Sequence, residues 1–246
     1  MGLFSLLARR SGGVSAEANY WLGKAEKAGL NSPFRNRYLS NAIRADPSCW
    51  RAYFSRAANR YSPGGKDVPP DYDGALSDLT QVINLAARST EAYCLRASIY
   101  SNLEDFSKAL VDLDQAVLVA RQETVAARAD IYLRRSEIHR KLGNLRACIA
   151  DSSEAIALEP EKTRGYVARG WTHLKRGDVS AARADFDTLV RLDPEAFYYV
   201  RARFLEEIGD IEAAISDYGA AIALDRKPSY LYLLRGQAHL RKGDLT

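Results

Sequence analysis

The feature that most constrains this chain is a short pattern that recurs along it: a tyrosine, two variable residues, an arginine and then a small residue. The pattern occurs six times, starting at Tyr53, Tyr93, Tyr132, Tyr166, Tyr198 and Tyr232. Successive tyrosines lie 40, 39, 34, 32 and 34 residues apart. A period in the range of about 20–50 residues indicates a repeat architecture, in which each unit stacks on its neighbours because it cannot bury its apolar face alone.

Each unit divides into two amphipathic segments joined by a tight turn. Eight residues after the arginine stands a turn signal, which is Gly143-Asn144, Gly177-Asp178, Gly209-Asp210, Gly243-Asp244 or, in the Tyr93 unit, Glu104-Asp105. Glycine favours the left-handed residue that ends many helices. The following segment contains alanine or cysteine with aspartate three residues later, and three units close with a proline. The pattern predicts an all-α fold, an α-solenoid of antiparallel helix pairs.

Together these features resemble the tetratricopeptide repeat (TPR) family, which has an aromatic residue early in the first helix, a small residue at the close helix crossing, a Gly-Asp turn and alanines in the second helix. The resemblance covers residues 16–246 as about six repeats followed by an unfinished seventh. The first repeat is the least regular, because Trp21-Leu22-Gly23 matches the family while the Tyr-x-x-Arg pattern is missing. Terminal repeats are often atypical because they act as caps. The resemblance implies a right-handed TPR superhelix.

Several stretches depart from the regular period. Residues 1–15 form a basic and apolar N-terminal segment, which we expect to cap the first helix pair or to dock on a partner, with a mitochondrial presequence as the alternative. In the Tyr53 unit the spacing from arginine to aspartate grows from 16 to 22 residues, which predicts an inserted loop at residues 61–73. That loop is either a functional element or a tolerated insertion. A shorter insertion near residues 121–127 lengthens the next link.

The N-terminal part of the chain and the remainder differ in net charge. Residues 1–60 contain ten Lys or Arg and three Asp or Glu, a net charge of +7, whereas the rest contains 25 and 28, a net charge of −3. A basic end favours an acidic partner, and a solvated charged face is the alternative. The sequence stops after the turn of the seventh unit, so we expect the natural protein to continue or another chain to cover this end.

Charged residues recur at one position of each predicted helix. The arginine of the pattern recurs in the first helices and an aspartate recurs in the second helices. A half-buried charge needs an opposite charge, because leaving it unpaired is costly. We therefore predict a structural ladder of ion pairs, a pairing that the TPR resemblance supports, made by Arg56, Arg96, Arg135, Arg169, Arg201 and Arg235 with Asp78, Asp112, Asp151, Asp185 and Asp217.

The sequence offers no residues arranged for catalysis or metal binding. His139, His173 and His239 occupy equivalent positions of successive repeats, roughly 10 Å apart as packed helices go. Zinc ligands lie about 2 Å from the ion, so histidines spaced in this way do not share one. The three cysteines form neither a CxxC pair nor an even disulfide framework. We predict that the chain is not an enzyme and uses no cofactor, metal or small-molecule substrate.

The residues that the repeat leaves variable are the candidates for partner binding. The positions one and five residues after each tyrosine share a face of the first helix, which we expect to be the concave face. Aromatic residues and arginine most often anchor protein interfaces. The predicted binding set is Trp171, Tyr199, Arg203, Tyr230, Leu233, Arg140, Lys141 and Lys175. The Lys and Asn residues with which some TPR proteins clamp chaperone tails are missing from these positions.

The predicted function is that of a scaffold or adaptor that binds a peptide or helix of a partner protein on the concave face. The alternative is an architectural subunit of a large cytoskeletal, ciliary or organellar complex, docked through several surfaces. A nucleic-acid partner is disfavoured, because RNA-reading repeats use variable polar residues where this chain mixes Leu, Val, Tyr and Cys. No stretch is apolar enough for a membrane span. The expected location is the cytoplasm, with a cilium, the cytoskeleton or an organelle as the alternative.

Overall fold

The structure, a computed structural model, describes residues 14–29, 32, 34–62, 68–86, 89–224 and 229–243. These residues form thirteen α-helices and one short 3-10 turn, and they contain no strand. Most of the N-terminal segment 1–15, residues 63–67 of the expected loop, and residues 244–246 lie outside the described part. None of the helices in the described part is both long enough and apolar enough to cross a membrane.

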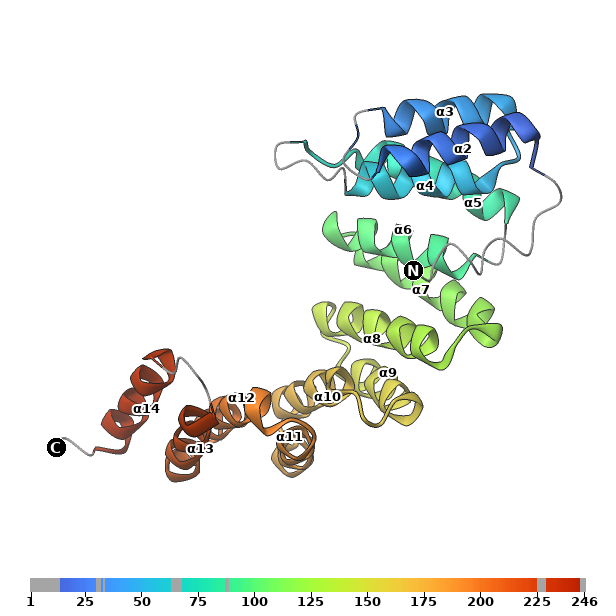
Figure 1. Cartoon of the computed structure of the whole chain (residues 1–246). Helices are drawn as coiled ribbons and strands as arrows, with labels where there is room; N and C mark the ends of the chain where they lie inside the picture. The colour runs from blue at the N-terminus through green and yellow to red at the C-terminus, as the bar shows by residue number, and fades with distance from the viewer. Residues whose placement is uncertain are drawn as a thin grey trace. The chain divides into compact units, whose positions relative to one another are not determined.

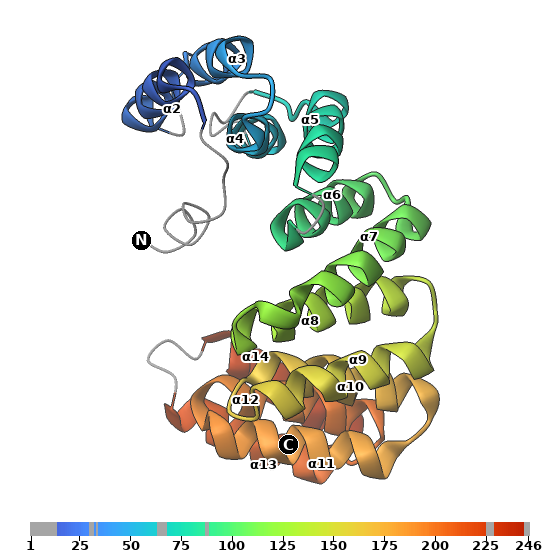
Figure 2. The ribbon, with the colours of Figure 1, turned by 90° about the vertical axis from the view of Figure 1, so that its right-hand side faces the viewer.

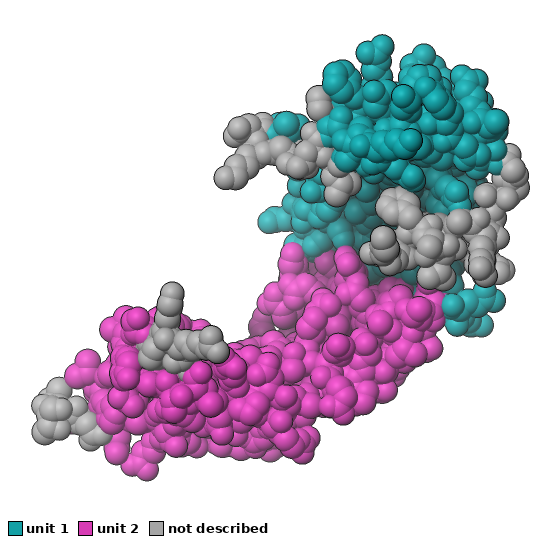
Figure 3. Space-filling view, in the orientation of Figure 1, with its two compact units in different colours: residues 1–122 teal, residues 123–246 magenta. Residues whose placement is uncertain are grey.

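The helices fall into two compact units, residues 1–122 and 123–246 (Figure 3). Unit 1 contains α2 (Ala16–Ala28), α3 (Arg35–Ala45), α4 (Trp50–Tyr61), α5 (Tyr72–Leu85), α6 (Thr90–Asn102), α7 (Phe106–Val119) and the 3-10 turn η1 (Ala120–Gln122). Unit 2 contains α8 (Val125–Lys141), α9 (Leu145–Leu158), α10 (Thr163–Arg176), α11 (Val179–Leu192), α12 (Pro194–Glu207), α13 (Ile211–Leu224) and α14 (Ser229–Lys242).

Within each unit, every helix packs on the helix that follows it in the chain (Figure 1, Figure 2). The even-numbered helices are the first helices of their repeats and the odd-numbered helices are the second helices. First helices also adjoin one another, as α10 does with α8. The all-α fold of antiparallel helix pairs that the sequence predicts is confirmed.

The turns within the four pairs α6–α7, α8–α9, α10–α11 and α12–α13 share one geometry. At Gly177 the backbone is left-handed, with φ of 90°, and the next amide, that of Asp178, donates to the carbonyl of His173 at 2.9 Å. This six-to-one hydrogen bond closes the helix end as a Schellman motif does. The Tyr93 unit makes the same turn without glycine, because Glu104 takes φ of 59° and the Asp105 amide donates to the Tyr100 carbonyl at 2.8 Å.

Small residues let the two helices of a repeat approach closely. Gly170 of α10 is one example, because a β-carbon at that position would lie 3.3 Å from both the β-carbon of Asp185 and the ring of Phe186. The alanine or cysteine near the start of each second helix is fully buried at Ala75, Ala109, Cys148, Ala182 and Ala214. The pattern therefore has a small residue after its arginine for a steric reason: a larger side chain there would collide with the second helix.

The two irregular stretches differ in outcome. α4 ends at Tyr61 and α5 begins at Tyr72, and the base of this insertion is tied by Arg60, which donates to the carbonyl of Gly74 at 2.9 Å. Most of the residues near 121–127, which were expected to lengthen the link, are helical instead: they form part of η1 and the first turn of α8, which is 17 residues long. The physical reason is local: Thr124 caps the amide of Ala127, and the alanine-rich residues after it favour a helix.

Candidate functional site

Helices of unit 2 line an open cavity of about 460 Å³. Residues of α8, α9, α10 and α12 line it, so it draws on three consecutive repeats. Its lining is Ser136, Glu137, Arg140, Cys148, Thr163, Arg164, Val167, Ala168, Trp171 and Phe197. We call this cavity the unit 2 groove. Its volume lies within the range of about 300–1,000 Å³ that is common for ligand pockets.

The floor of the unit 2 groove is apolar. Val167 and Trp171 are one helical turn apart on α10, and Phe197 comes from the start of α12. The Trp171 ring meets Phe186 edge to face, with ring centroids 5.0 Å apart, and Phe186 belongs to the buried core of the unit. Trp171 is thus half-buried: one side of its ring packs on the core, and the ring lines the groove as a fixed aromatic surface.

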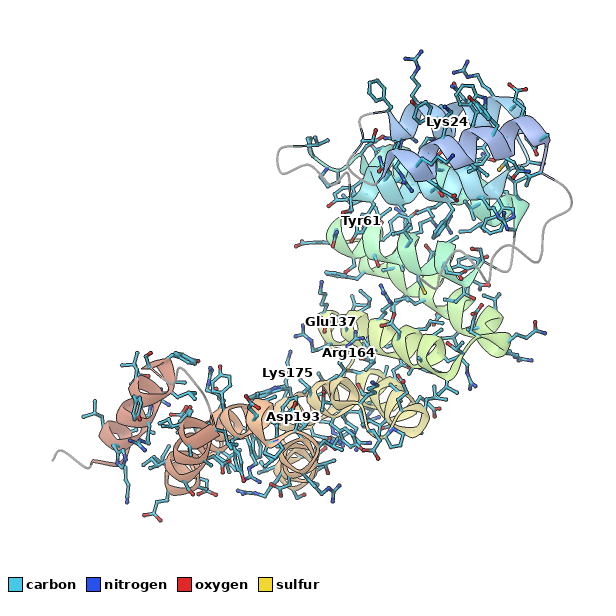
Figure 4. The ribbon with its side chains drawn as sticks, viewed as in Figure 1. Lys24, Tyr61, Glu137, Arg164, Lys175 and Asp193 are labelled. Atoms are coloured by element: carbon cyan, nitrogen blue, oxygen red, sulfur yellow. The ribbon has the colours of Figure 1, made fainter. Side chains whose placement is uncertain are left out.

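The rim of the groove carries two ion-pair systems. Arg140 donates two hydrogen bonds to Glu137 at 2.6 and 2.7 Å, and these bonds lower the pKa of Glu137. Arg164 donates to Asp130 at 3.0 Å, and Arg134 donates to the same carboxylate. Burial alone would raise the pKa of Asp130, but these hydrogen bonds outweigh it and lower the pKa. Glu137 and Arg164 come from neighbouring first helices, α8 and α10 (Figure 4).

A second cluster joins α12 to α14. The Tyr230 hydroxyl donates to the Tyr199 hydroxyl at 3.0 Å, and the two rings meet edge to face with centroids 5.8 Å apart. This hydrogen bond raises the pKa of Tyr230. Partial burial alone would lower the pKa of Arg203, but hydrogen bonding to Tyr199 raises it. We call Tyr199, Arg203 and Tyr230 the tyrosine cluster.

The structure divides the predicted binding set into groups. Trp171 and Arg140 line the unit 2 groove, and Tyr199, Arg203 and Tyr230 form the tyrosine cluster. The remaining three, Leu233, Lys141 and Lys175, are exposed and do not line the unit 2 groove.

Thr163, Arg164 and Phe197 are among the groove residues that the predicted binding set does not contain. The helical period could have found two of them, because Thr163 and Arg164 precede Val167 by four and three residues and share its face. Phe197 has no such signal, because it reaches the groove from a different helix.

The ladder residues form bidentate ion pairs in five repeats. In each, the arginine Nε donates to one carboxylate oxygen and Nη2 donates to the other, at 2.6–3.0 Å. The pairs are Arg56–Asp78, Arg96–Asp112, Arg135–Asp151, Arg169–Asp185 and Arg201–Asp217. Every aspartate is buried and every arginine keeps some exposure, so the pairs lie at the edge of the core.

Four of these arginines also reach the preceding repeat. Their Nη1 atoms donate to a side chain on the preceding second helix, at 2.8–3.2 Å; where that helix carries a ladder aspartate, the acceptor lies two residues after it. These pairs are Arg56–Ser40, Arg96–Thr80, Arg169–Ser153 and Arg201–Asp187. The ladder arginine therefore links its own two helices and also the repeat before it.

The histidines lie beside ladder or turn carboxylates. His139 has its Nε2 atom 3.8 Å from Asp151, and His173 has its Nδ1 atom 3.5 Å from Asp178. No group of three or more His, Cys, Asp or Glu residues within the described ranges is arranged to hold a metal ion.

Unit 1 has a smaller cavity of about 200 Å³ between α2 and α4, which the sequence analysis did not predict. Its apolar lining includes Leu22, Trp50 and Phe54, and Glu26 and Arg51 add charge. It is less than half the volume of the unit 2 groove.

Comparisons with known proteins agree with the repeat. The tetratricopeptide repeat family matches the chain at residues 90–123, 129–162, 167–230 and 199–246. Bacteriophage adsorption protein A of Escherichia coli (strain K12) is 34% identical over 108 residues, which are 44% of this chain and 8% of that protein. The chain thus spans a small fraction of that relative's length.

Solved structures show the same fold. A tetratricopeptide repeat protein from Parabacteroides merdae ATCC 43184 matches with a TM-score of 0.69 at 19% identity, over 93% of this chain and 88% of that one. YrrB, described as a TPR protein with an unusual peptide-binding site, matches with a TM-score of 0.61 at 17% identity, over 81% of this chain and 97% of that one. The chain belongs to the tetratricopeptide repeat family of helical protein-interaction scaffolds.

Proposed function

We propose that this protein binds, without catalysis, a peptide segment of a partner protein in the unit 2 groove. The observation that carries the proposal is the groove itself, which has an apolar floor and a charged rim made by positions that the repeat leaves variable. A cytoplasmic location and membership of a larger complex belong to the same proposal. The peptide-binding site attributed to YrrB, which has the same fold, is consistent with it.

The groove suits a peptide with one large apolar side chain. Such a side chain would cover Val167, Trp171 and Phe197, and each Å² of apolar surface removed from water contributes about 25 cal/mol. The rim guanidinium of Arg164 is 68% exposed, so its free N–H groups can donate to peptide carbonyl or carboxylate oxygens. The tyrosine cluster lies on the next first helices and offers further polar contacts to the same peptide.

The test is a selection of random peptides on the wild-type chain, followed by affinity measurements on two groove variants. Arg164→Glu reverses a rim charge, and Val167→Thr places a hydroxyl on the floor without changing its shape. We expect the selected peptides to bind each variant at least tenfold more weakly. The matched control is Arg191→Glu, which changes an exposed arginine on α11 outside the groove.

The folded state of each variant is checked by circular dichroism before binding is measured. Peptides that bind the groove variants as tightly as the wild type would contradict the groove as the binding site. That outcome would favour the alternative, an architectural subunit that docks through other surfaces.

A further inference from the structure

One stripe of α10 carries the floor of the unit 2 groove and a cation at each end. Arg164, Val167, Trp171 and Lys175 follow one another at intervals of three and four residues, so they share one face of the helix. Val167 and Trp171 belong to the floor, and Arg164 belongs to the rim. Lys175 lies one turn beyond Trp171 and is exposed, and Figure 4 shows it near the opposite end of α10 from Arg164. We call Arg164 and Lys175 the end cations.

Both end cations can take a further anion. The Arg164 side chain is 68% exposed and donates to Asp130 through one atom, Nη1. Arg134 donates to the same carboxylate, so these three side chains together keep a net positive charge. Lys175 makes no hydrogen bond or ion pair with any residue that the structure describes. α10 itself contains no aspartate or glutamate.

The carboxylates of the neighbouring first helices are engaged within their own helices. On α8, Glu137 accepts two hydrogen bonds from Arg140. At the start of α12, Asp193 caps the helix by accepting a hydrogen bond from the amide of Ala196 at 3.1 Å. The groove therefore presents an apolar floor between two available positive charges, which is complementary to a ligand with two negative charges.

We propose that the unit 2 groove binds an acidic peptide in which two carboxylate side chains flank one large apolar residue. This inference rests on the proposed function and names the class of peptide. Eleven residue steps separate the end cations, and at the rise of an α-helix they span about 16 Å. An extended peptide covers that length in about five residues. Its apolar side chain covers Val167 and Trp171, while one carboxylate faces Arg164 and the other faces Lys175.

The probes are unlabelled synthetic peptides of the form GSXSLWSXSG with both termini blocked, so that neither terminal charge contributes. The two X positions are both aspartate, both lysine, or one of each in either order. Isothermal titration calorimetry on the full 246-residue chain measures the affinities. We expect the peptide with two aspartates to bind at least tenfold more tightly than the peptide with two lysines. Raising the salt concentration should shrink this difference, because ions screen exposed charges.

Reversing the charges of the protein should reverse the preference one end at a time. Lys175→Glu should bind one of the two mixed peptides best, and Arg164→Glu should bind the other mixed peptide best. The double variant should prefer the peptide with two lysines. Each single reversal should change the preference at its end by about tenfold, because a repulsion replaces an attraction. The pairing of variants with mixed peptides also gives the direction of the peptide along α10.

The matched control is Arg176→Glu, which makes the same kind of charge reversal one residue after Lys175. Arg176 pairs with Asp178 of the turn and lies off the stripe. It should keep the wild-type order of affinities within about twofold. Circular dichroism first checks that each variant is folded, and Lys175→Glu breaks no contact with the described residues.

Three results would overturn the inference: no binding of the peptide with two aspartates, equal binding of the aspartate and lysine peptides, or charge-reversal variants that keep the wild-type order. If peptides selected on the wild type still weaken with Val167→Thr, the groove remains the binding site and only its preference for acidic peptides is wrong. If no peptide can be selected at all, the proposed function is wrong as well.

Discussion

A ladder arginine makes several kinds of contact at once. Arg169 grips Asp185 with two hydrogen bonds, donates a third to Ser153 of the preceding repeat, and lies over the ring of Tyr166 at 5.8 Å. The hydrogen bonds to aspartate raise the pKa of Arg169. Because the carboxylate is buried, removing the guanidinium leaves an uncompensated charge, which is more costly than the pair itself is stabilising.

Two adjacent arginines of α8 test whether burial of the paired carboxylate sets the cost of removing an arginine. Arg135 pairs with buried Asp151, whereas Arg134 is 44% exposed and pairs with the half-buried Asp130. Arg135→Ala should lower the free energy of unfolding by about 3 kcal/mol. Arg134→Ala should lower it by less than about 1 kcal/mol. Urea unfolding followed by helical circular dichroism measures both, and equal losses for the two variants would show that burial of the carboxylate does not set the cost.

Tyr218 makes stability depend on alkaline pH. Its hydroxyl donates to Glu206 at 2.7 Å, and its side chain is fully buried. Burial, together with the hydrogen bond to this carboxylate, raises the pKa of the Tyr218 phenol from its ordinary value of 10.0. A raised pKa means that the unfolded chain ionises first, so the stabilisation is complete below pH 10 and falls as the pH rises above it.

We therefore expect the free energy of unfolding to decline as the pH rises above about 10, and Tyr218→Phe to make that decline smaller. The measurement is urea unfolding of both proteins at a series of pH values. Tyr20, an exposed tyrosine, provides the matched control, and Tyr20→Phe should leave the slope as in the wild type. Parallel slopes for wild type and Tyr218→Phe would contradict the assignment.

At the scale of the element, the turn within each helix pair decides how the second helix returns. Four turns use glycine with φ between 76° and 90°, while the α6–α7 turn uses Glu104 with φ of 59°. The left-handed region costs a residue with a β-carbon about 1–2 kcal/mol. Glu104 is exposed, so its side chain contributes little packing.

Replacing this residue with glycine should stabilise the protein. Glu104→Gly removes the strain but gives the unfolded chain more conformational freedom, and the net gain should be about 0.5–1 kcal/mol. Gly177→Ala makes the reverse change in an equivalent turn and should destabilise by about 1–2 kcal/mol. Thermal unfolding of the two variants and the wild type measures whether each change raises or lowers stability. A loss of stability in Glu104→Gly would contradict the idea that the backbone of Glu104 is strained.

At the scale of the whole molecule, the chain is two compact units with separate cores. One buried cluster, around Phe186, Phe204 and Tyr218, lies within unit 2. Two others, around Leu79 and around Ala52, lie within unit 1. In repeat proteins stability is approximately a sum of repeat and nearest-neighbour terms, so a block of repeats with its own core can fold alone.

We expect a fragment of residues 123–246 to remain helical and to unfold cooperatively. It keeps the α8–α9, α10–α11 and α12–α13 pairs and all lining residues of the unit 2 groove. Circular dichroism with urea measures the folding, and peptides selected on the full chain should bind the fragment with affinity within about threefold. A fragment without cooperative unfolding would show that unit 2 depends on unit 1 for its stability.

The sequence by itself determined the repeat. The spacing of Tyr, Arg, the turn and Asp is local information, and it predicted the helix pairs, the turns and the residues that meet as Arg–Asp pairs. The helical period also predicted that Val167 and Trp171 share a face. These predictions needed only the geometry of one repeat, which the next repeat copies.

Only the tertiary structure decided where cavities form and which of the predicted binding residues lie together. Phe197 enters the unit 2 groove from another repeat, and the aromatic residues of the predicted binding set separate into Trp171 in the groove and the two tyrosines of the tyrosine cluster. The physical reason is that the helical period fixes which residues share a face of one helix, while the distance between faces of different helices depends on how their side-chain volumes pack.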